Sequence, residues 1–272
     1  MPVHACRAPM KRVRAFKSEC LPALVVTLAI GGCTVDRSVD TDEPGSGSTG
    51  AVQDLRASLS RSMSDNRVLS YSEAWEVLSK AFEVAPGQIR LFYTRRLIPA
   101  SERASGADQH EPDHWNREHL WPQSYGIRAT GARTDLHNLV PADATVNSSR
   151  GNKWFDEVLI AHHECTDCAV STEAWEPPDE AKGDVARAMF YMDVRYEGDV
   201  DDGVPDLSLG DRPAPEQQRF GRLSALIDWH CADPVSEEET RRHEVLSAAQ
   251  GNRNAFIDEP YLAGRVYGFV CR

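Results

Sequence analysis

Apolar residues recur at helical spacing directly after Ser70. Ser70 and Glu73 have the spacing of a capping box, and Pro86-Gly87 interrupts the pattern. The apolar positions between them fall on one helical face: Ala74, Trp75, Leu78, Ala81 and Phe82. The pattern predicts an amphipathic helix over residues 71–84.

Three later segments also carry helical signals. The apolar content of residues 184–196 predicts a buried helix, and an apolar stripe predicts another over residues 219–230. Ser236 is a candidate N-cap whose box Glu239 would complete. The helix that follows has two charge pairs at i,i+4 spacing: Glu237 with Arg241, and Glu238 with Arg242.

One segment reads as a strand. In residues 89–96, alternation places Ile89, Leu91 and Tyr93 on one face. Several helices with few strands predict a helix-rich α+β domain.

The N-terminus has the pattern of an export signal. A basic stretch from Met10 to Lys17 precedes the apolar run of residues 21–30 and the sequence "IGGC", which resembles a bacterial lipobox ending at Cys33. We expect residues 1–33 to be a signal peptide and Cys33 to be lipidated. Cleavage by ordinary signal peptidase and an uncleaved anchor are the alternatives, and Met10 is an alternative start to Met1.

Polar composition separates this signal from the folded part. Residues 34–50 are rich in Asp, Ser, Gly and Thr, which bury too little surface to fold, so they are expected to form a disordered tether. The domain is then residues 51–272, which we expect to be monomeric and to be exported to the outer membrane, the periplasm or the medium.

The net negative charge of the chain argues against some classes of function. The 272-residue chain has a formal charge of −12, and residues 1–33 contribute five Lys and Arg against one Glu. The processed chain would be still more acidic, which argues against a protein that coats nucleic acid by charge alone. A catalyst that must release a polyanion tolerates such a charge.

Four cysteines follow Cys33. In an oxidising compartment an even number favours disulfides, and three pairings of Cys165, Cys168, Cys231 and Cys271 are open. The sequence "HHECTDC" at residues 162–168 also has the residue types of a zinc site, although the second half of such a motif is missing. Disulfides are the favoured interpretation.

A locally basic segment lies inside this acidic chain. Residues 116–153 hold five Arg and Lys against three acids, which marks a place for a phosphate. The basic residues are Arg117, Arg128, Arg133, Arg150 and Lys153.

The same segment contains the groups that phosphodiester hydrolysis needs. A neutral His119 imidazole would accept a proton from water. Glu118 and Asn147 would supply oxygen ligands to a divalent cation, for which Mg²⁺ is the first choice and Ca²⁺ or Mn²⁺ are alternatives. Arg150, whose planar fork suits a phosphate oxygen, is the preferred clamp, and Arg133 is the second.

Five successive blocks resemble the endonuclease I family of secreted and periplasmic bacterial nucleases. They are "WNREHLWPQSYG", "DLHNLVPADATVNSSRGN", "KGDVARAMFYMDVRYEG", "DWHCADPVSEEETRRHEV" and "QGNRNAFIDEP", and the resemblance runs from about residue 89 to 269. It implies a ββα-metal (His-Me finger) core, with His119 as general base and Glu118 and Asn147 as metal ligands. It also implies cleavage of DNA, and often RNA, without strong sequence preference and with 5′-phosphate products.

The sequence departs from that family in one respect. Only 27 residues separate His119 from Asn147, so the longer insertion that carries a phosphate-binding Arg in some members is missing. Beyond Arg150 and Arg133, five residues are further candidates: Arg117, Asp135, His137, Asn138 and Asn152. Asp135, His137 and Asn138 would orient His119 or serve as buried polar groups, and Tyr125 would be a packing aromatic. Arg117 is a further phosphate contact, and Asn152 is the alternative metal ligand.

Two rival functions remain open at this stage. One is an inactive, surface-anchored nucleic-acid-binding protein, and retention of Glu118, His119 and Asn147 together argues against it. The other is a zinc-stabilised surface lipoprotein, for which residues 162–168 are the support.

Overall fold

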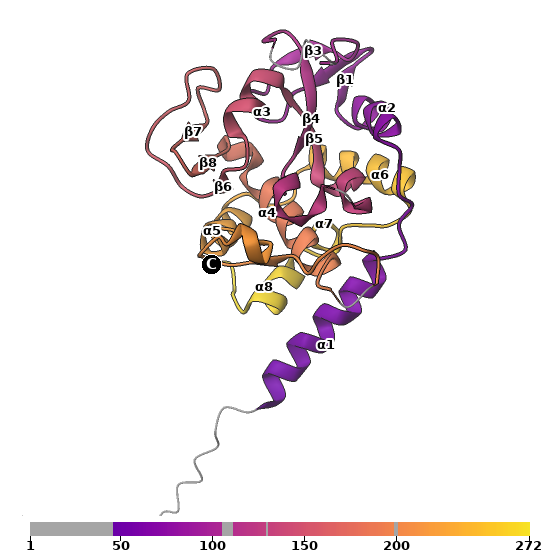
Figure 1. Cartoon of the computed structure of the whole chain (residues 1–272), viewed down its shortest axis with the longest axis vertical. Coiled ribbons are helices and arrows are strands. Elements are labelled where there is room, and N and C mark those ends of the chain that lie inside the picture. The colour runs from indigo at the N-terminus through magenta and orange to yellow at the C-terminus, as the bar shows by residue number, and fades with distance from the viewer. Residues whose placement is uncertain (1–45, 105–110, 129, 199–200) are drawn as a thin grey trace, which may run out of the picture. The chain divides into compact units, whose positions relative to one another are not determined.

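The computed structural model describes residues 46–104, 111–128, 130–198 and 201–272 (Figure 1). Its helices are α1 (Ser46–Met63), α2 (Tyr71–Ala81), α3 (Ala144–Arg150), α4 (Asp179–Arg195), α5 (Leu223–Ala232), α6 (Glu237–Gln250), α7 (Ala255–Asp258) and α8 (Tyr261–Tyr267). Its strands are β1 (Glu83–Ala85), β2 (Gln88–Arg90), β3 (Leu97–Pro99), β4 (Trp115–His119), β5 (Leu139–Asp143), β6 (Trp154–Phe155), β7 (Ala169–Val170), β8 (Ala174–Glu176), β9 (Ser208–Leu209) and β10 (Arg219–Phe220). The predicted α+β class is confirmed.

The predicted signal segment, including Cys33, lies outside the described residues. The predicted tether, residues 34–50, is wrong at its C-terminal end, because α1 already begins at Ser46. Helix α1 contacts α4, and Arg56 in the middle of α1 forms a 3.0 Å ion pair with Asp193 of α4. The helix therefore has a tertiary partner. Among the described helices, none combines the length and the apolar character needed to cross a membrane.

The predicted helix after Ser70 is confirmed with its capping box. The Ser70 hydroxyl accepts from the Glu73 backbone N–H, and the Glu73 carboxylate accepts from the Ser70 N–H. The helix ends at Ala81 rather than at residue 84, because the chain turns there into the hairpin of β1 and β2. The buried helix predicted at residues 184–196 is also confirmed, and it begins earlier, at Asp179.

The strand predicted for residues 89–96 is only partly correct. Strand β2 ends at Arg90, and the next residues form a turn in which the Arg95 N–H donates to the Leu91 carbonyl. Leu91, Phe92 and Tyr93 are all buried, so their side chains do not alternate as a strand requires. This turn brings Tyr93 under the site described below.

The helix predicted for residues 219–230 begins only at Leu223. Arg219 and Phe220 instead form β10, which pairs in parallel with β9. A side chain at Gly221 would meet the Gly210 carbonyl oxygen at 2.1 Å, so this glycine lets the two backbone segments approach. Backbone contact between the segments overrides the apolar stripe.

Only one of the two hydrogen bonds of the capping box predicted for α6 is present among the described residues. The Ser236 hydroxyl accepts from the Glu239 N–H, but the Glu239 carboxylate accepts from the buried Arg187 of α4 instead of returning to the cap. The predicted pair of Glu238 with Arg242 is present at 2.9 Å, whereas Arg241 donates to the Glu83 carbonyl. Burial against α4 therefore redirects one capping side chain into a buried ion pair.

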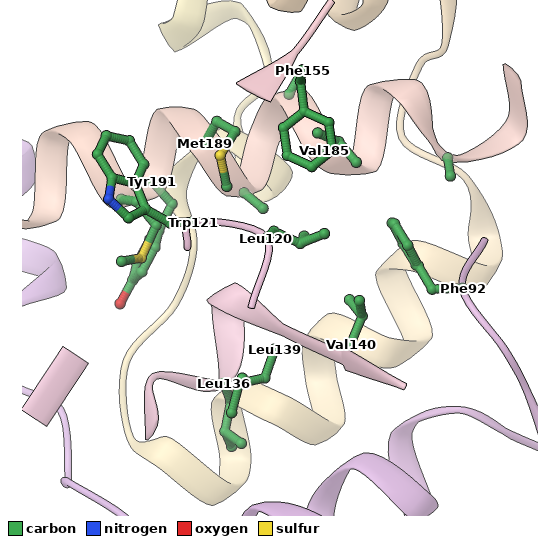
Figure 2. Close-up of a cluster of buried hydrophobic side chains, with 14 of the residues drawn as sticks. Phe92, Leu120, Trp121, Leu136, Leu139, Val140, Phe155, Val185, Met189 and Tyr191 are labelled. Atoms are coloured by element: carbon green, nitrogen blue, oxygen red, sulfur yellow. The ribbon is translucent and has the colours of Figure 1, made fainter. Parts of the chain in front are cut away.

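A buried apolar cluster joins the β4–β5 hairpin to α4. Figure 2 shows Leu120, Leu139 and Val140 of the hairpin region facing Val185 and Met189 of α4, and all five side chains are buried. Removing such surface from water is the main stabilising term in folding. The hairpin is therefore supported on a packed layer, which fixes the position of the strand end at His119.

Two disulfides are present, as predicted. Cys165 bonds to Cys168, and Cys231 bonds to Cys271. Because Cys165 and Cys168 are joined to each other, neither offers a thiolate to zinc. The zinc interpretation of residues 162–168 is wrong for this structure.

Candidate active site

A two-stranded hairpin followed by a helix brings the central sequence motifs together. Strands β4 and β5 are antiparallel, with Trp115 opposite Asp143 and His119 opposite Leu139. Helix α3 starts directly after β5, and Asn147 lies one turn into it. In Figure 1, α3 lies beside the hairpin, whose other side faces α2. His119, the last residue of β4, thus lies near a helix that begins 25 positions later in the chain.

A pocket opens between the end of β4 and α3. Its volume is about 270 Å³. The lining includes seven of the polar residues discussed here: Arg117, Glu118, His119, Gln123, Arg128, Asn147 and Asn152. The structure therefore gathers the predicted base and all predicted cation ligands at one pocket.

Glu118 is buried at the floor of this pocket. The Tyr93 hydroxyl donates to Glu118 Oε1 at 2.9 Å, and Arg150 Nη1 lies 3.0 Å from the same oxygen. Both of these side-chain contacts fall on Oε1, and the His119 backbone N–H also hydrogen-bonds to this carboxylate. Burial raises the pKa of Glu118, while the charge of Arg150 and the Tyr93 hydrogen bond act against that rise.

The surroundings of His119 select one tautomer. Its Nε2 lies 2.9 Å from the Arg133 carbonyl oxygen, and a carbonyl can only accept, so Nε2 carries the proton. Nδ1 keeps its lone pair, and the Gln123 amide is 3.4 Å away, longer than an ordinary hydrogen bond. Burial, together with the nearby charge of Arg133, lowers the pKa of His119 to about 4. The imidazole is therefore neutral at physiological pH.

Asn147 is oriented by a residue of the neighbouring strand. Its Nδ2 donates to Asn116 Oδ1 at 2.6 Å, which leaves Asn147 Oδ1 without a role in that contact. In the described residues no three His, Cys, Asp or Glu side chains converge as a metal site. A cation here would rest on a carboxylate oxygen, an amide oxygen and water. This oxygen-only set fits Mg²⁺, which keeps several of its waters.

Arg150 does not have the position expected of a phosphate clamp. Its side chain is 0% exposed, and it donates to the carbonyls of His119 and Leu120 at 2.8 Å and 2.5 Å. The guanidinium also lies 4.7 Å from the Phe155 ring centroid. Apolar packing and backbone acceptors hold it beneath the pocket, so it fixes the strand end and Glu118 rather than reaching a phosphate.

Asp135, His137 and Asn138 serve as buried polar groups. Asp135 accepts from the hydroxyls of Tyr191 and Tyr196, each at 2.8 Å. His137 contacts the Asn252 carbonyl, and Asn138 accepts from the Trp121 N–H. In the described structure the ring of His119 is contacted by Arg133 and Gln123 instead. Tyr125 is likewise buried and packs edge-on against Phe220.

Three arginines near the pocket have no carboxylate partner among the described residues. Arg117 and Arg128 line the pocket, and Arg133 supplies the carbonyl that holds His119. The guanidinium carbons of Arg117 and Arg133 lie 3.3 Å and 4.2 Å from the ring centroid of Tyr71. These positive charges are thus available to anions, which agrees with the basic segment predicted from the sequence.

Sequence reasoning missed three residues of this site. Tyr93 holds Glu118, Asn116 holds Asn147, and Tyr71 supports two arginines. Only Asn116 carried a usable signal, because it lies two positions before Glu118 and therefore on the same face of the strand.

Comparison with known proteins identifies the family of this chain. The family described as Endonuclease I matches residues 51–261. The extracellular ribonucleases of Bacillus subtilis (strain 168) and Bacillus amyloliquefaciens are each 40% identical to this chain, over 84% and 85% of it and 79% and 80% of their own lengths. An extracellular deoxyribonuclease of Aeromonas hydrophila is 27% identical over 46% of this chain and 49% of its own. The chain belongs to the endonuclease I family.

Proposed function

We propose that this protein is an exported, divalent-metal-dependent endonuclease that hydrolyses phosphodiester bonds of DNA and RNA to products with 5′-phosphates. In this proposal β4, β5 and α3 form a ββα-metal (His-Me finger) core. Glu118 and Asn147 bind the cation, and His119 is the general base.

One observation carries the proposal. His119 is a neutral imidazole with its Nδ1 lone pair next to a pocket, and the Glu118 carboxylate and the Asn147 amide line the same pocket. A base and a cation site at one pocket are the two components that hydrolysis by water needs.

The residues of the chain have separate tasks in this reaction. Nδ1 of His119 accepts a proton from the attacking water, and the Arg133 carbonyl keeps accepting from Nε2 of the imidazolium that results. The water oxygen forms a bond to phosphorus while the bond between phosphorus and the 3′-oxygen breaks, and the 3′-oxygen takes a proton from solvent, which leaves a 5′-phosphate and a 3′-hydroxyl. Arg128 binds oxygens of the phosphate being cleaved, and Arg117 is a further phosphate contact at the pocket.

A bound cation, Mg²⁺ first and Ca²⁺ or Mn²⁺ as alternatives, would polarise a phosphate oxygen and neutralise charge on the leaving 3′-oxygen. The oxygen-only donor set supports this choice over zinc.

Both nucleic acids are proposed as substrates. The nucleophile is water rather than a ribose 2′-hydroxyl, so the chemistry does not separate RNA from DNA. Two relatives at 40% identity are named extracellular ribonucleases, and a relative at 27% identity is named an extracellular deoxyribonuclease. Phosphate contacts carry no sequence information directly, so we expect cleavage with little sequence preference.

The experiment is digestion of a plasmid and of a structured RNA by wild-type protein and by His119→Ala, with Mg²⁺ and with EDTA. We expect both substrates to be cut by the wild type only in Mg²⁺. Digestion in EDTA would exclude the metal-dependent reaction, and absence of any digestion would favour an inactive binding protein.

Export and lipid anchoring are a separate proposal. They are supported by the sequence of residues 1–33 and by relatives named extracellular or periplasmic. Labelling with a palmitate analogue should mark the wild type and not Cys33→Ser. A secreted, unlabelled wild-type protein would instead indicate ordinary signal cleavage. Size-exclusion chromatography of the processed protein should give a monomer.

A further inference from the structure

A cluster of two arginines and two aromatic residues lies beside the pocket. Tyr71, the first residue of α2, has its ring centroid 6.3 Å from that of His119, and the two rings are inclined by only 21°. Arg117 lies 3.3 Å from the Tyr71 ring centroid and 4.2 Å from that of Trp75, one helical turn later. Arg133 lies 4.2 Å from the Tyr71 ring centroid. We call these four residues, Tyr71, Trp75, Arg117 and Arg133, the arginine–aromatic cluster.

The positive charges of this cluster are not neutralised within the described part of the chain. No carboxylate there pairs with Arg117 or Arg133, and the buried Nε atoms of both lack a hydrogen-bond partner. Two like charges against one ring repel each other, and the ring faces offset only part of that cost. An anion would relieve this repulsion.

The cluster continues the pocket on the side away from the cation ligands. Arg117 and Glu118 are successive residues of β4, so their side chains leave the strand on opposite faces. Arg117 still lines the pocket, and the Arg133 carbonyl holds His119. An anion on this cluster would therefore lie close to the general base but not on the Glu118 and Asn147 side.

We propose that the arginine–aromatic cluster is a second phosphate subsite, which binds the backbone phosphate next to the one being cleaved. This inference rests on the proposed nuclease function and deepens it. The preferred substrate is then a strand with at least two adjacent phosphates, and a compound with a single diester is a poor one.

Small substrates test the proposal directly. The dinucleotide TpT has one diester, whereas pTpT and TpTp add a terminal phosphate on the 5′ or the 3′ side. We expect one of the two additions to raise kcat/KM of the wild type by about tenfold, the scale of one charge-assisted hydrogen bond. The side that responds gives the direction of the strand across the pocket. Equal kcat/KM for all three compounds would overturn the subsite.

Variants assign the effect to the cluster. Arg133→Gln keeps the backbone carbonyl that holds His119, and Tyr71→Leu removes the shared ring. In both we expect the ratio of kcat/KM with and without the added phosphate to fall toward one, while Arg133→Lys recovers part of it. Arg61→Gln on α1, exposed and with the same change in net charge, should keep the wild-type ratio. Melting temperatures identify any variant that fails to fold. If Tyr71→Leu fails to fold, Arg133→Gln alone tests the subsite.

Salt dependence gives a second readout. In a His119→Ala background, the slope of log affinity for a single strand against log salt should become shallower by about 0.7 for each phosphate contact removed. An unchanged slope in Arg133→Gln would contradict the proposal. If the wild type cleaves neither these compounds nor a plasmid, the proposed function itself fails. If TpT is cleaved but no added phosphate helps, only the subsite fails.

Discussion

Two regions of the molecule bury the same three kinds of residue. Each holds a glutamate paired with a buried arginine, and in each a histidine has its pKa lowered to about 4 by burial. The pocket trio is Glu118, Arg150 and His119, and the α4–α6 trio is Glu239, Arg187 and His243.

The two trios differ in whether their hydrogen-bond acceptors already have partners inside the protein. In the α4–α6 trio, both oxygens of Glu239 accept from Arg187, at 2.7 Å and 2.6 Å. Both ring nitrogens of His243 have partners, Asp258 at 3.2 Å and Ser247 at 3.3 Å. Every polar atom named here is used inside the protein, so this trio stabilises the packing of α4 on α6.

The pocket trio leaves acceptors open instead. Glu118 receives both of its side-chain contacts on one oxygen, and Nδ1 of His119 has the long approach of Gln123 as its contact among the described residues. Identical residue types therefore serve structure in one place and are free for chemistry in the other. The difference lies in lone pairs that face a pocket and not in burial or pKa.

The largest expected effect separates the two histidines. His119→Ala should lose roughly 10²- to 10⁴-fold in turnover, the usual contribution of a positioned base, while keeping its fold and metal binding. His243→Ala should lower the melting temperature and leave turnover per folded molecule unchanged. Plasmid digestion and thermal melting of both variants measure this contrast. If folded His119→Ala kept nearly wild-type turnover, His119 would not be the general base, and the two histidines would not differ in function.

Replacing each arginine is expected to be nearly as severe. Arg187→Met strands a buried carboxylate and should cost about 3–5 kcal/mol of unfolding free energy. Arg150→Met should cost a similar amount, and it should also reduce turnover of the folded fraction because the His119 and Leu120 carbonyls lose their donor. Urea unfolding combined with activity per folded molecule distinguishes the two. Equal activity losses in both variants would contradict separate roles.

The metal requirement is expected to change only at the pocket. Asn147→Ala and Glu118→Ala should each raise the Mg²⁺ concentration for half-maximal activity, because each removes one proposed oxygen ligand. Asn116→Ala should raise this Mg²⁺ concentration less, by about a hundredfold at most, because Asn116 orients Asn147 and is not itself a proposed ligand. His119→Ala should bind metal like the wild type, and Asn66→Ala, which does not line the pocket and accepts from Arg195, should also keep the wild-type titration. A wild-type curve for Asn147→Ala would point to Asn152 as the helix ligand.

The last expected effect is an acid sensitivity to which histidines of both regions and His230 of α5 contribute. The pKa values of His119, His230 and His243 are about 4 in the folded protein, against about 6.5 when unfolded. Between these values the unfolded chain binds more protons, so stability is present above about pH 6.5 and is lost as the pH falls toward 4. Melting temperatures should follow this course.

One variant isolates a single contribution to that course. His230→Phe should flatten the pH dependence, because the His230 ring already packs against Phe190 and Phe269 and phenylalanine carries no proton. The exposed His163→Gln is the matched control. A His230→Phe profile that parallels the wild type would rule out this residue as a source.

The sequence predicted what is encoded locally. The cap of α2 and the residue types gathered at the pocket follow from short-range patterns, and the resemblance to endonuclease I supplied the roles of His119, Glu118 and Asn147. The position of Arg150 could not be read in this way. Its burial depends on Phe155 and on the carbonyls at the end of β4, which come near only in the folded chain.

Long-range contacts also explain the misplaced elements. The turn after Arg90 buries three successive residues, and the segment before Leu223 is held in β10 by contact with β9. Tyr71 was likewise visible only as the first residue of a helix, because its contacts with Arg117 and Arg133 join segments about 46 to 62 positions apart along the chain. Such contacts leave no periodic trace in the sequence.

The hydrogen bonds from Arg150 to the His119 and Leu120 carbonyls have a consequence for the dynamics of catalysis. They fix the peptide groups at the end of β4 before any cation or substrate arrives, so the conformational entropy of that segment is already lost on folding. Among the described residues, the exposed side chain of Arg128 is one that binding still has to order. A site arranged in this way works by pre-organisation rather than by closure, and the backbone amides around His119 should exchange with solvent as slowly in the free protein as in the complex.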